Sequence, residues 1–434
     1  MANSYLNRTT GGSATGATTW TYSVWLKRSK LGGGSAQKIL AAGSSSSDRT
    51  EINLGGSDTL DIYRNISGSE VNLASTRVFR DTNGWYNFCI QNNNGTVTVY
   101  CNGETVAMSS ATLGTNKINN TSTVHYIGQQ VAGGQYFEGY MSHAALVDGS
   151  VVAPTVFGET DSTSGIWKFK SPSGVTWGTN GFHLKFENSG AMGTDSSGNT
   201  NTFTVNGNLK QALDTPSNVY ATLNPLHRLD GYTLTEGNNT FTNSSTGHRM
   251  ANSTLAVNTG KWYAEVKVIA QDGSATYPQI GIIEPEKFVF NSYVGNDSRG
   301  YAYLSNGNTQ YDGNVVSSWG ASYTVGDIIG IAMDLTNNKI YFSKNGTFQA
   351  SGNPASGATG TGSAYTIASG VYYTFAQSSY DGSQNPVYNW NFGNGFFGTT
   401  AITSAGSNGN GSLFEYDVPS GYYALNTKNI NTYG

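Results

Sequence analysis

Apolar and polar residues alternate most clearly in residues 326–346, which read GDIIGIAMDLTNNKIYFSKNG. Two runs rich in β-branched and other apolar residues flank Asn337-Asn338, and asparagine tolerates the positive φ angles of a tight turn. The segment therefore predicts a β-hairpin in which alternate side chains of both strands face one core. A two-residue loop would place Leu335 opposite Ile340 and Met333 opposite Phe342.

The first part of the chain shows the same period of two, in short runs that glycine, asparagine and serine separate. No run there has the period expected of a helix. We therefore predict an antiparallel β-sandwich over residues 1–188. Its expected strands lie within residues 19–29, 51–56, 59–65, 84–91, 96–104 and 181–188.

A change in composition follows this first sandwich. The next residues are rich in glycine, serine, asparagine and threonine, and Pro216 and Pro225 interrupt any continuous sheet. A chain of 434 residues is long enough for two or three domains. We predict an all-β protein with two tandem antiparallel β-sandwiches. The expected parts are a sandwich at 1–188, a linker at 189–217, a sandwich at 218–400 and a C-terminal extension at 401–434.

Residues 218–400 resemble the SPRY domain, a compact β-sandwich used for binding. The resemblance rests on the hairpin at 326–346 and on GKWYAEVKV at 260–268, IGI at 280–282, GYAYLSNG at 300–307 and WNFG at 390–393. It implies a binding module, and it also implies that Trp319 packs against the core.

Residues 1–188 are similar to laminin-G-like and concanavalin-like jelly rolls. The similarity lies in the two tryptophans of residues 19–29, followed by GWYNF, TVTVYCNGE, YIG and FEGYMSHAALVDG. Segments 193–204, 214–225 and 421–430 resemble the linker and the ending of virion proteins from marine-type tailed bacteriophages. This last resemblance implies a protein on the outer surface of a phage particle.

The charge balance excludes two classes of partner. Charged residues make up 12% of the chain, about half the usual share, and the formal net charge is −4. Nothing in this balance favours a nucleic-acid backbone or an anionic membrane. The chain starts MANSYLNRTT, without a basic segment and an apolar run, and no stretch approaches 18 apolar residues. We therefore expect no signal peptide and no membrane insertion.

Cys89 and Cys101 flank one predicted hairpin turn at Asn94-Gly95. A loop of even length gives paired residues an odd index sum, which places the two thiols on opposite faces of the sheet. We therefore expect two buried or half-buried free thiols, with a disulfide only if the loop has an odd length.

Residue patterns typical of catalysis are missing. A sandwich glycosidase needs two carboxyl groups about 5 to 9 Å apart. Asp58 and Asp61 have the wrong parity, and Glu284 and Glu286 lie in an expected loop. We predict no enzyme, and a glycan depolymerase is the least favoured alternative. The histidines show no metal-binding or catalytic spacing; they occur at positions 125, 143, 183, 227 and 248.

A calcium site is an open alternative, because jelly-roll lectins often hold calcium between loops. Asp48, Asp58 and Asp61 lie in a suitable region, and Asp195 shares a turn with Asn199. Ordinary Asx-turns explain the same residues. We name no metal ligands and expect no other cofactor.

Four aromatic residues are the candidate ligand-binding residues: Tyr293, Tyr311, Trp319 and Tyr380. They fall in expected loops of the second domain, among glycine, asparagine and serine. Flat rings beside amide and hydroxyl groups suit stacking on sugar rings. Alternatively, these rings close the ends of the sandwich.

These features together predict a virion surface protein, a tail fibre, head fibre or decoration protein that binds a host-surface glycan. The alternative is a purely structural decoration or connector protein. The expected partners are other virion proteins and host polysaccharide. Because single shallow sites bind weakly, we expect a homo-oligomer, with a trimer as the expected form. The expected location is the outer surface of the virion, after synthesis in the host cytoplasm.

Overall fold

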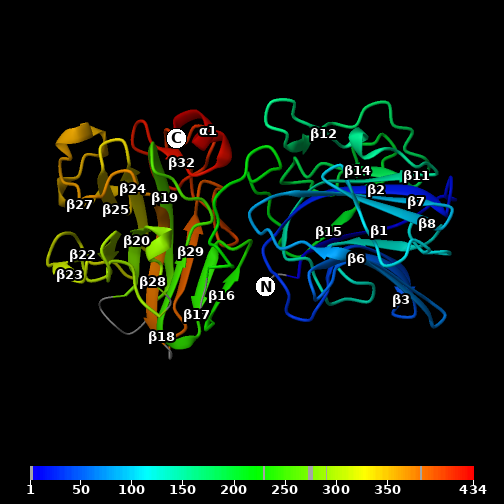
Figure 1. Cartoon of the computed structure of the whole chain (residues 1–434), viewed down its shortest axis with the longest axis horizontal. Coiled ribbons are helices and arrows are strands. Elements are labelled where there is room, and N and C mark those ends of the chain that lie inside the picture. Colours follow the sequence, from blue (N-terminus) through cyan, green and yellow to red (C-terminus); the bar gives the residue numbers. More distant parts are fainter. Residues whose placement is uncertain (1–2, 228–229, 272–276, 290, 382–383) are drawn as a thin grey trace. The chain divides into compact units, whose positions relative to one another are not determined.

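The structure is a computed structural model that describes residues 3–227, 230–271, 277–289, 291–381 and 384–434. It is nearly all-β, with 43% of residues in strands and 5% in helices, as the alternating pattern predicts. The chain divides into two compact units, residues 1–211 and 212–434. Each unit is built from sheets that are antiparallel except for one short parallel pair in the second unit (Figure 1).

The first sheet of the first unit contains most of the early hairpins. Its neighbouring strands pair antiparallel. In spatial order its described strands are β15 (Thr204–Asn206), β1 (Tyr5–Thr9), β10 (Val124–Ile127), β3 (Gln37–Ser45), β4 (Asp48–Leu54), β5 (Thr59–Ile66) and β6 (Ser69–Val78).

The second sheet of this unit shares one core with the first. Trp20, Tyr22, Val24 and Leu26 alternate along one strand, and all four are fully buried in that core. This burial is what the period of two in the sequence requires. In spatial order the described strands are β14 (Phe182–Leu184), β11 (Gly139–Asp148), β2 (Thr19–Arg28), β7 (Tyr86–Asn93), β8 (Thr96–Cys101) and β9 (Glu104–Val106).

The chain between β11 and β14 covers the other face of the second sheet. It contains a 3-10 turn (Pro154–Val156) and the paired strands β12 (Gly158–Thr160) and β13 (Trp167–Phe169). Phe157 packs on that face, and its carbonyl accepts a hydrogen bond from the Trp25 indole at 3.4 Å. The centre of the second sheet is therefore buried on both faces.

The cysteine prediction is confirmed. The β7–β8 turn has two residues, Asn94 and Gly95, both with positive φ, and Phe88 pairs with Cys101. Cys101 faces the core between the sheets, whereas Cys89 faces the outer layer. Both thiols are free and buried.

The predicted linker at 189–217 differs from what the structure shows. β15 pairs with β1, and Phe203 packs edge-on against Phe182 with ring centroids 4.8 Å apart. Phe203 is buried in the first core. The turn-rich composition therefore conceals a short strand that closes the first sheet, and the first unit extends to residue 211.

The second unit has a larger sheet that runs under its C-terminal segment. Along its main path the order is β16 (Tyr232–Thr235), β17 (Thr240–Asn243), β29 (Val387–Asn391), β19 (Lys261–Ala270), β24 (Ile328–Asp334), β25 (Lys339–Lys344) and β26 (Thr347–Phe348). Two short strands join it at the side: β27 (Tyr365–Thr366) pairs with β25, and β32 (Tyr423–Ala424) pairs with β19.

The opposing sheet of the second unit contains Tyr311 and Tyr380, two of the four candidate residues. In order its described strands are β18 (Ser245–Asn252), β28 (Thr374–Asp381), β20 (Gln279–Ile283), β21 (Gly300–Leu304), β22 (Thr309–Tyr311) and β23 (Asn314–Val316). The short remaining elements are the pair β30 (Phe396–Phe397) and β31 (Thr400–Ala401), and 3-10 turns at Pro285–Lys287, Gln349–Ser351 and Pro354–Thr359.

The predicted hairpin forms, but its register differs by two residues from the prediction. Met333 pairs with Ile340 rather than with Phe342, which pairs with Ile331. The physical reason is the Asp334 carboxylate, which accepts hydrogen bonds from the backbone N–H and the side chain of Asn337, both at 2.8 Å. These bonds close a four-residue loop. A shift of two residues keeps the same face inward, so the predicted apolar residues remain buried.

The predicted C-terminal extension at 401–434 packs onto the second sandwich. Glu265, buried on β19, accepts backbone hydrogen bonds from Glu415 at 2.8 Å and from Tyr416 at 2.9 Å. The chain then forms β32 and ends in a helix, α1 (Thr427–Tyr433), whose N-cap is Asn426. A helix of seven residues is too short to show a helical period in the sequence, so this helix was not predicted.

Candidate functional site

Tyr380 is the most exposed of the four predicted binding residues, and the other three are half-buried. It lies near the end of β28, and 46% of its surface is accessible. Its cross-strand partner on β18 is His248, with ring centroids 4.9 Å apart. Even and odd residues of β28 face opposite sides, so Phe375 points into the core while Tyr380 points outward.

Two further rings complete this group. Tyr277 stacks on Tyr380 with centroids 5.7 Å apart, and Tyr293 lies 4.9 Å from His248. We call His248, Tyr277, Tyr293 and Tyr380 the tyrosine cluster. The structure thus brings together Tyr293 and Tyr380, which are 87 positions apart in sequence.

Tyr311 and Trp319 lie elsewhere, against the core. Tyr311 is in β22 rather than in a loop, and its ring stacks on Tyr301 at 4.6 Å and 7°. Trp319 packs edge-on against Tyr303 and Phe342. Both rings are half-buried against the second core, which is the alternative that the sequence left open for them.

The tyrosine cluster is held in place by polar contacts. The Tyr277 hydroxyl lies 3.5 Å from His248 Nδ1, and the Tyr277 carbonyl accepts a hydrogen bond from Ser305 at 2.6 Å. Burial, and to a lesser degree the charge of Arg249, lower the pKa of His248. The imidazole is therefore neutral near pH 7, and the cluster offers flat uncharged rings to a ligand.

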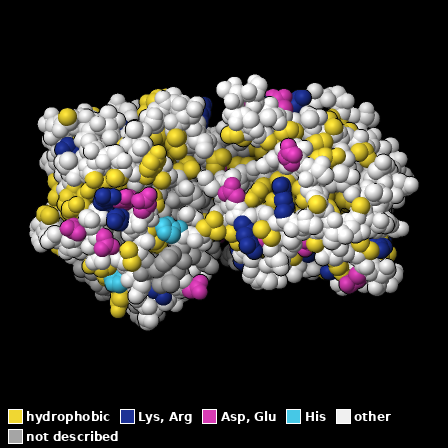
Figure 2. Space-filling view, viewed as in Figure 1, with side chains coloured by type: hydrophobic (Ala, Val, Ile, Leu, Met, Phe, Trp, Pro, Cys, Tyr) yellow, Lys and Arg dark blue, Asp and Glu magenta, His cyan; other side chains and the backbone are white. Residues whose placement is uncertain are grey.

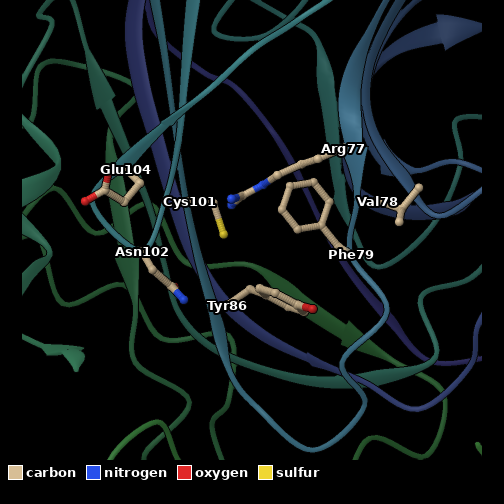
Figure 3. A pocket seen from close by; sticks show the side chains of 7 residues that line it. All are labelled: Arg77, Val78, Phe79, Tyr86, Cys101, Asn102 and Glu104. Carbon is tan, nitrogen blue, oxygen red and sulfur yellow. The ribbon is translucent and has the colours of Figure 1, made fainter. Parts of the chain in front are cut away.

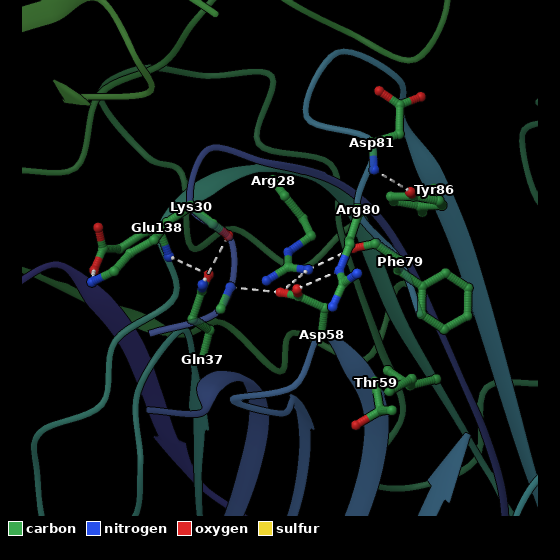
Figure 4. Close-up of polar contacts among 12 residues, drawn as sticks. Arg28, Lys30, Gln37, Asp58, Thr59, Phe79, Arg80, Asp81, Tyr86 and Glu138 are labelled. Carbon is green, nitrogen blue, oxygen red and sulfur yellow. Dashed lines mark hydrogen bonds and ion pairs between the residues drawn. The ribbon is translucent and has the colours of Figure 1, made fainter. Parts of the chain in front are cut away.

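Asp58, a candidate calcium ligand from the sequence, instead forms ion pairs with two arginine side chains (Figure 4). Its carboxylate lies 3.0 Å from Arg28 Nη1 and 2.8 Å from Arg80 Nε, and it accepts the Gly32 N–H at 2.6 Å. These donors outweigh burial and lower the pKa of Asp58. Arg28 also donates to the Phe79 carbonyl. Asp58 therefore ties together the loops at one end of the first sandwich.

The other acidic candidates also have protein partners. Asp48 pairs with Lys117 at 2.6 Å, and Asp61 accepts a hydrogen bond from Thr59 at 2.7 Å. Asp195 accepts backbone hydrogen bonds from His183 and from Asn201. Within the described ranges, no group of three His, Cys, Asp or Glu side chains is arranged to hold a metal ion.

One histidine pair forms that was not predicted from the sequence. His143 Nδ1 lies 3.3 Å from His183 Nε2, although the two residues are 40 positions apart. They lie on adjacent strands, β11 and β14, where Ala145 is the direct partner of His183. A bulge after Ser142 gives His143 a φ of 49° and turns its ring toward His183. Spacing along the chain gives no signal for this contact.

The surface carries few charges. Figure 2 shows a face that is mostly uncharged polar side chains and backbone, with Lys, Arg, Asp and Glu scattered over it. No helix within the described part of the chain is long and apolar enough to cross a membrane.

Comparisons with known proteins agree with the two predicted sandwiches. Residues 2–157 match the model of the Concanavalin A-like lectin/glucanases superfamily, and residues 261–372 match the SPRY domain model. A Ran-binding proteins 9/10 homolog of Drosophila melanogaster is 33% identical over 93 residues, which are 20% of this chain and 9% of that protein. The chain thus spans about a tenth of the length of that relative.

Two solved structures are similar to parts of this chain. The SPRY domain of human HERC1 is 16% identical, with a TM-score of 0.32, and the match covers 39% of this chain and 96% of that one. A putative carbohydrate binding protein from Bacteroides ovatus is 16% identical, with a TM-score of 0.34, over 47% of this chain and 56% of that one. By the matched family models, the N-terminal sandwich is similar to the concanavalin A-like lectin/glucanases superfamily, and the C-terminal sandwich is similar to the SPRY domain.

Proposed function

We propose that this chain is a non-enzymatic glycan-binding protein whose tyrosine cluster contacts the sugar. The observation that carries the proposal is the exposed Tyr380 ring, fixed by His248 on one strand and by Tyr277 at its side. Such a ring is already ordered, so it loses little conformational freedom when a sugar ring packs on it. Neutral rings also suit a neutral ligand.

The first domain supports the same reading. It matches a superfamily that contains lectins and glucanases. We propose that this domain acts as a lectin and not as a glucanase. The acidic residues considered for hydrolysis are engaged otherwise: Asp58 binds Arg28 and Arg80, and Glu284 binds Arg299 at 2.7 Å. Carboxylates held in this way are poor general acids.

We further propose that this protein lies on the outer surface of a tailed-phage particle, as a fibre or decoration protein. Its support is the resemblance of residues 193–204, 214–225 and 421–430 to phage virion proteins. Its partners would be other virion proteins and host polysaccharide. Many copies, in the proposed trimer or array, would compensate for weak single sites. Electron microscopy of particles labelled with antibody to this chain tests the location.

The binding test compares isolated protein and multimers on intact host cells and on cells stripped of surface polysaccharide. We expect multimers to bind only intact cells, with little change between low and high salt, because no ion pair is involved. Tyr380→Ala should weaken binding at least tenfold. Tyr372→Ala is the matched control, because Tyr372 is 56% exposed in the same domain and lies outside the cluster.

Two results would reject the proposal. Equal binding to intact and stripped cells would show that polysaccharide is not the ligand. Equal effects of Tyr380→Ala and Tyr372→Ala would show that the cluster is not the contact surface. A protein that binds neither cell type would support the structural alternative, in which both sandwiches contact only other virion proteins.

A further inference from the structure

The first domain contains a pocket that the proposed function does not use (Figure 3). It lies where the terminal strands of the two sheets meet, between the end of β6 and the turn from β8 to β9. Its volume is about 340 Å³, at the lower end of the range for small-molecule sites. The lining residues are Arg77, Val78, Phe79, Tyr86, Cys101, Asn102 and Glu104.

The wall of the pocket is aromatic and fixed. Phe79 and Tyr86 meet edge-on with centroids 5.5 Å apart. The Tyr86 hydroxyl accepts the Asp81 N–H at 2.9 Å, and the Phe79 carbonyl accepts a hydrogen bond from buried Arg28. These bonds hold both rings against the core, so a ligand meets a preformed apolar surface.

Arg77 supplies the positive charge of the pocket. Its guanidinium lies 4.8 Å from the centroid of the Phe79 ring, and in Figure 3 it extends toward Cys101. Among the described residues, no carboxylate lies within ion-pair distance of Arg77, although thirteen other ion pairs are formed there. Burial raises the pKa of Cys101 to about 11, so the neutral thiol leaves the positive charge uncompensated. A guanidinium in this state matches a carboxylate.

Hydroxyl-binding groups face Arg77 across the pocket. Asn102 and Glu104 lie on the side opposite Arg77 (Figure 3). The Asn102 side-chain oxygen accepts the Asn87 N–H at 2.7 Å, which orients the amide and leaves its N–H₂ group for a ligand. Glu104 is exposed and can accept hydrogen bonds from hydroxyl groups.

We propose that this pocket binds the uronic acid residue of an acidic polysaccharide. The carboxylate of the sugar would bind Arg77, its ring would pack against Phe79 and Tyr86, and its hydroxyls would bind Asn102 and Glu104. Exposed Arg77, Val78 and Glu104 form the rim, so the polysaccharide chain can continue in both directions along the surface. This site is separate from the tyrosine cluster and takes a charged sugar where that cluster takes a neutral one.

The test measures binding of the full chain to a trisaccharide of galacturonic acid by calorimetry. The matched neutral probe is a trisaccharide of galactose, which has a hydroxymethyl group in place of each carboxylate. We expect the acidic probe to bind at least tenfold more tightly, and its affinity to fall several-fold between low and high salt. Arg77→Gln should reduce that affinity at least tenfold.

Arg64→Gln is the control, because it removes the same charge from the first sheet outside the pocket. Thermal unfolding of each variant checks that it is folded. The proposal fails if Arg77→Gln and Arg64→Gln act alike, if the two sugars bind equally, or if a tripeptide with a free C-terminal carboxylate binds more tightly. Loss of acidic binding in Tyr380→Ala but not in Arg77→Gln would also overturn it. That pattern would leave the tyrosine cluster as the binding surface.

Discussion

His143 Nδ1 lies 3.3 Å from His183 Nε2. The two rings lie under the segment that covers the second sheet of the first domain. Phe169 stacks on His143 with centroids 3.6 Å apart, and Trp177 stacks on His183 at 5.7 Å. Phe169 belongs to β13 and Trp177 follows it in the chain. The covering segment thus packs directly on the histidine pair through these two aromatic rings.

We predict that acid destabilises the first domain through this pair. Burial, together with nearby positive charge, lowers the pKa of His143 to about 3 and that of His183 to about 4. The charged groups that act on the pair are Lys185, Glu187 and Asp195. Because the folded-state pKa values lie below the unfolded value, the pair adds stability above about pH 6.5 that is lost as the pH falls. At pH 5 the loss should be on the order of 1–2 kcal/mol per histidine.

Denaturant unfolding at pH 7 and pH 5 measures this effect. Asparagine tolerates the left-handed backbone of position 143 and has no titratable side chain, so His143→Asn removes the titration without backbone strain. We expect a smaller difference between the two pH values in a His143→Asn, His183→Gln variant than in the natural chain. His227→Gln, in the other domain, is the control. An unchanged pH dependence in the double variant would show that other groups set the acid sensitivity.

The second domain should respond to pH in the opposite direction, through Glu265. Burial raises the pKa of Glu265 to about 7, although the N–H groups of Glu415 and Tyr416 oppose the shift. A folded pKa above the unfolded one gives stability that is complete below about pH 4.5 and lost as the pH rises through 7. The total effect is roughly 3 kcal/mol at most. Glu265→Gln should flatten stability between pH 5 and pH 8, whereas Glu286→Gln, at an exposed position, should not.

The fold could be predicted further than the sites. Period-two alternation identifies the strands, and parity alone assigns Cys89 and Cys101 to opposite faces. Parity does not fix loop length, so the Asp334–Asn337 hydrogen bonds that set the hairpin register were not visible in the pattern. Nor can a sequence show that His143 meets His183, because that contact depends on a bulge and on the pairing of strands distant along the chain.

The candidate binding residues also depend on features that the sequence does not show. Tyrosines among small polar residues look alike in sequence, but the phase of each residue within its strand decides its environment. Tyr380 occupies an outward-facing position on β28, whereas Tyr311 occupies a core-facing position on β22. Predicting this difference requires the exact strand bounds, which glycine-rich segments leave undefined.

The hairpin register gives a third prediction. Phe342 is fully buried beside Tyr303 and Trp319, so Phe342→Ala should reduce the free energy of unfolding by roughly 3–5 kcal/mol. Asp334→Ala should also be severe, because it leaves Lys261 and the loop amides without their acceptor. Asn337→Ala keeps its own backbone N–H and should be much milder. Equal losses for the two loop variants would mean that Asp334 does not set the register.

The last prediction concerns where the chain can be divided. A break after residue 188 removes β15, the buried Phe203 and the Asp195 turn that binds His183. Fragment 1–211 keeps all three. We therefore expect fragments 1–211 and 212–434 each to be soluble and to unfold in one cooperative transition.

Fragment 1–188 should be less stable than 1–211 by roughly 3 kcal/mol or more, because the pocket left by Phe203 exposes the core to water. Truncation of the second fragment at residue 400 should be equally harmful, since Tyr422, Ala424 and Leu425 are fully buried and the buried Glu265 would lose its two backbone donors. Circular dichroism and chemical denaturation of the four fragments provide the measurement. If 1–188 were as stable as 1–211, the β15 pairing would contribute nothing and the segment would act as the simple linker that its composition suggests.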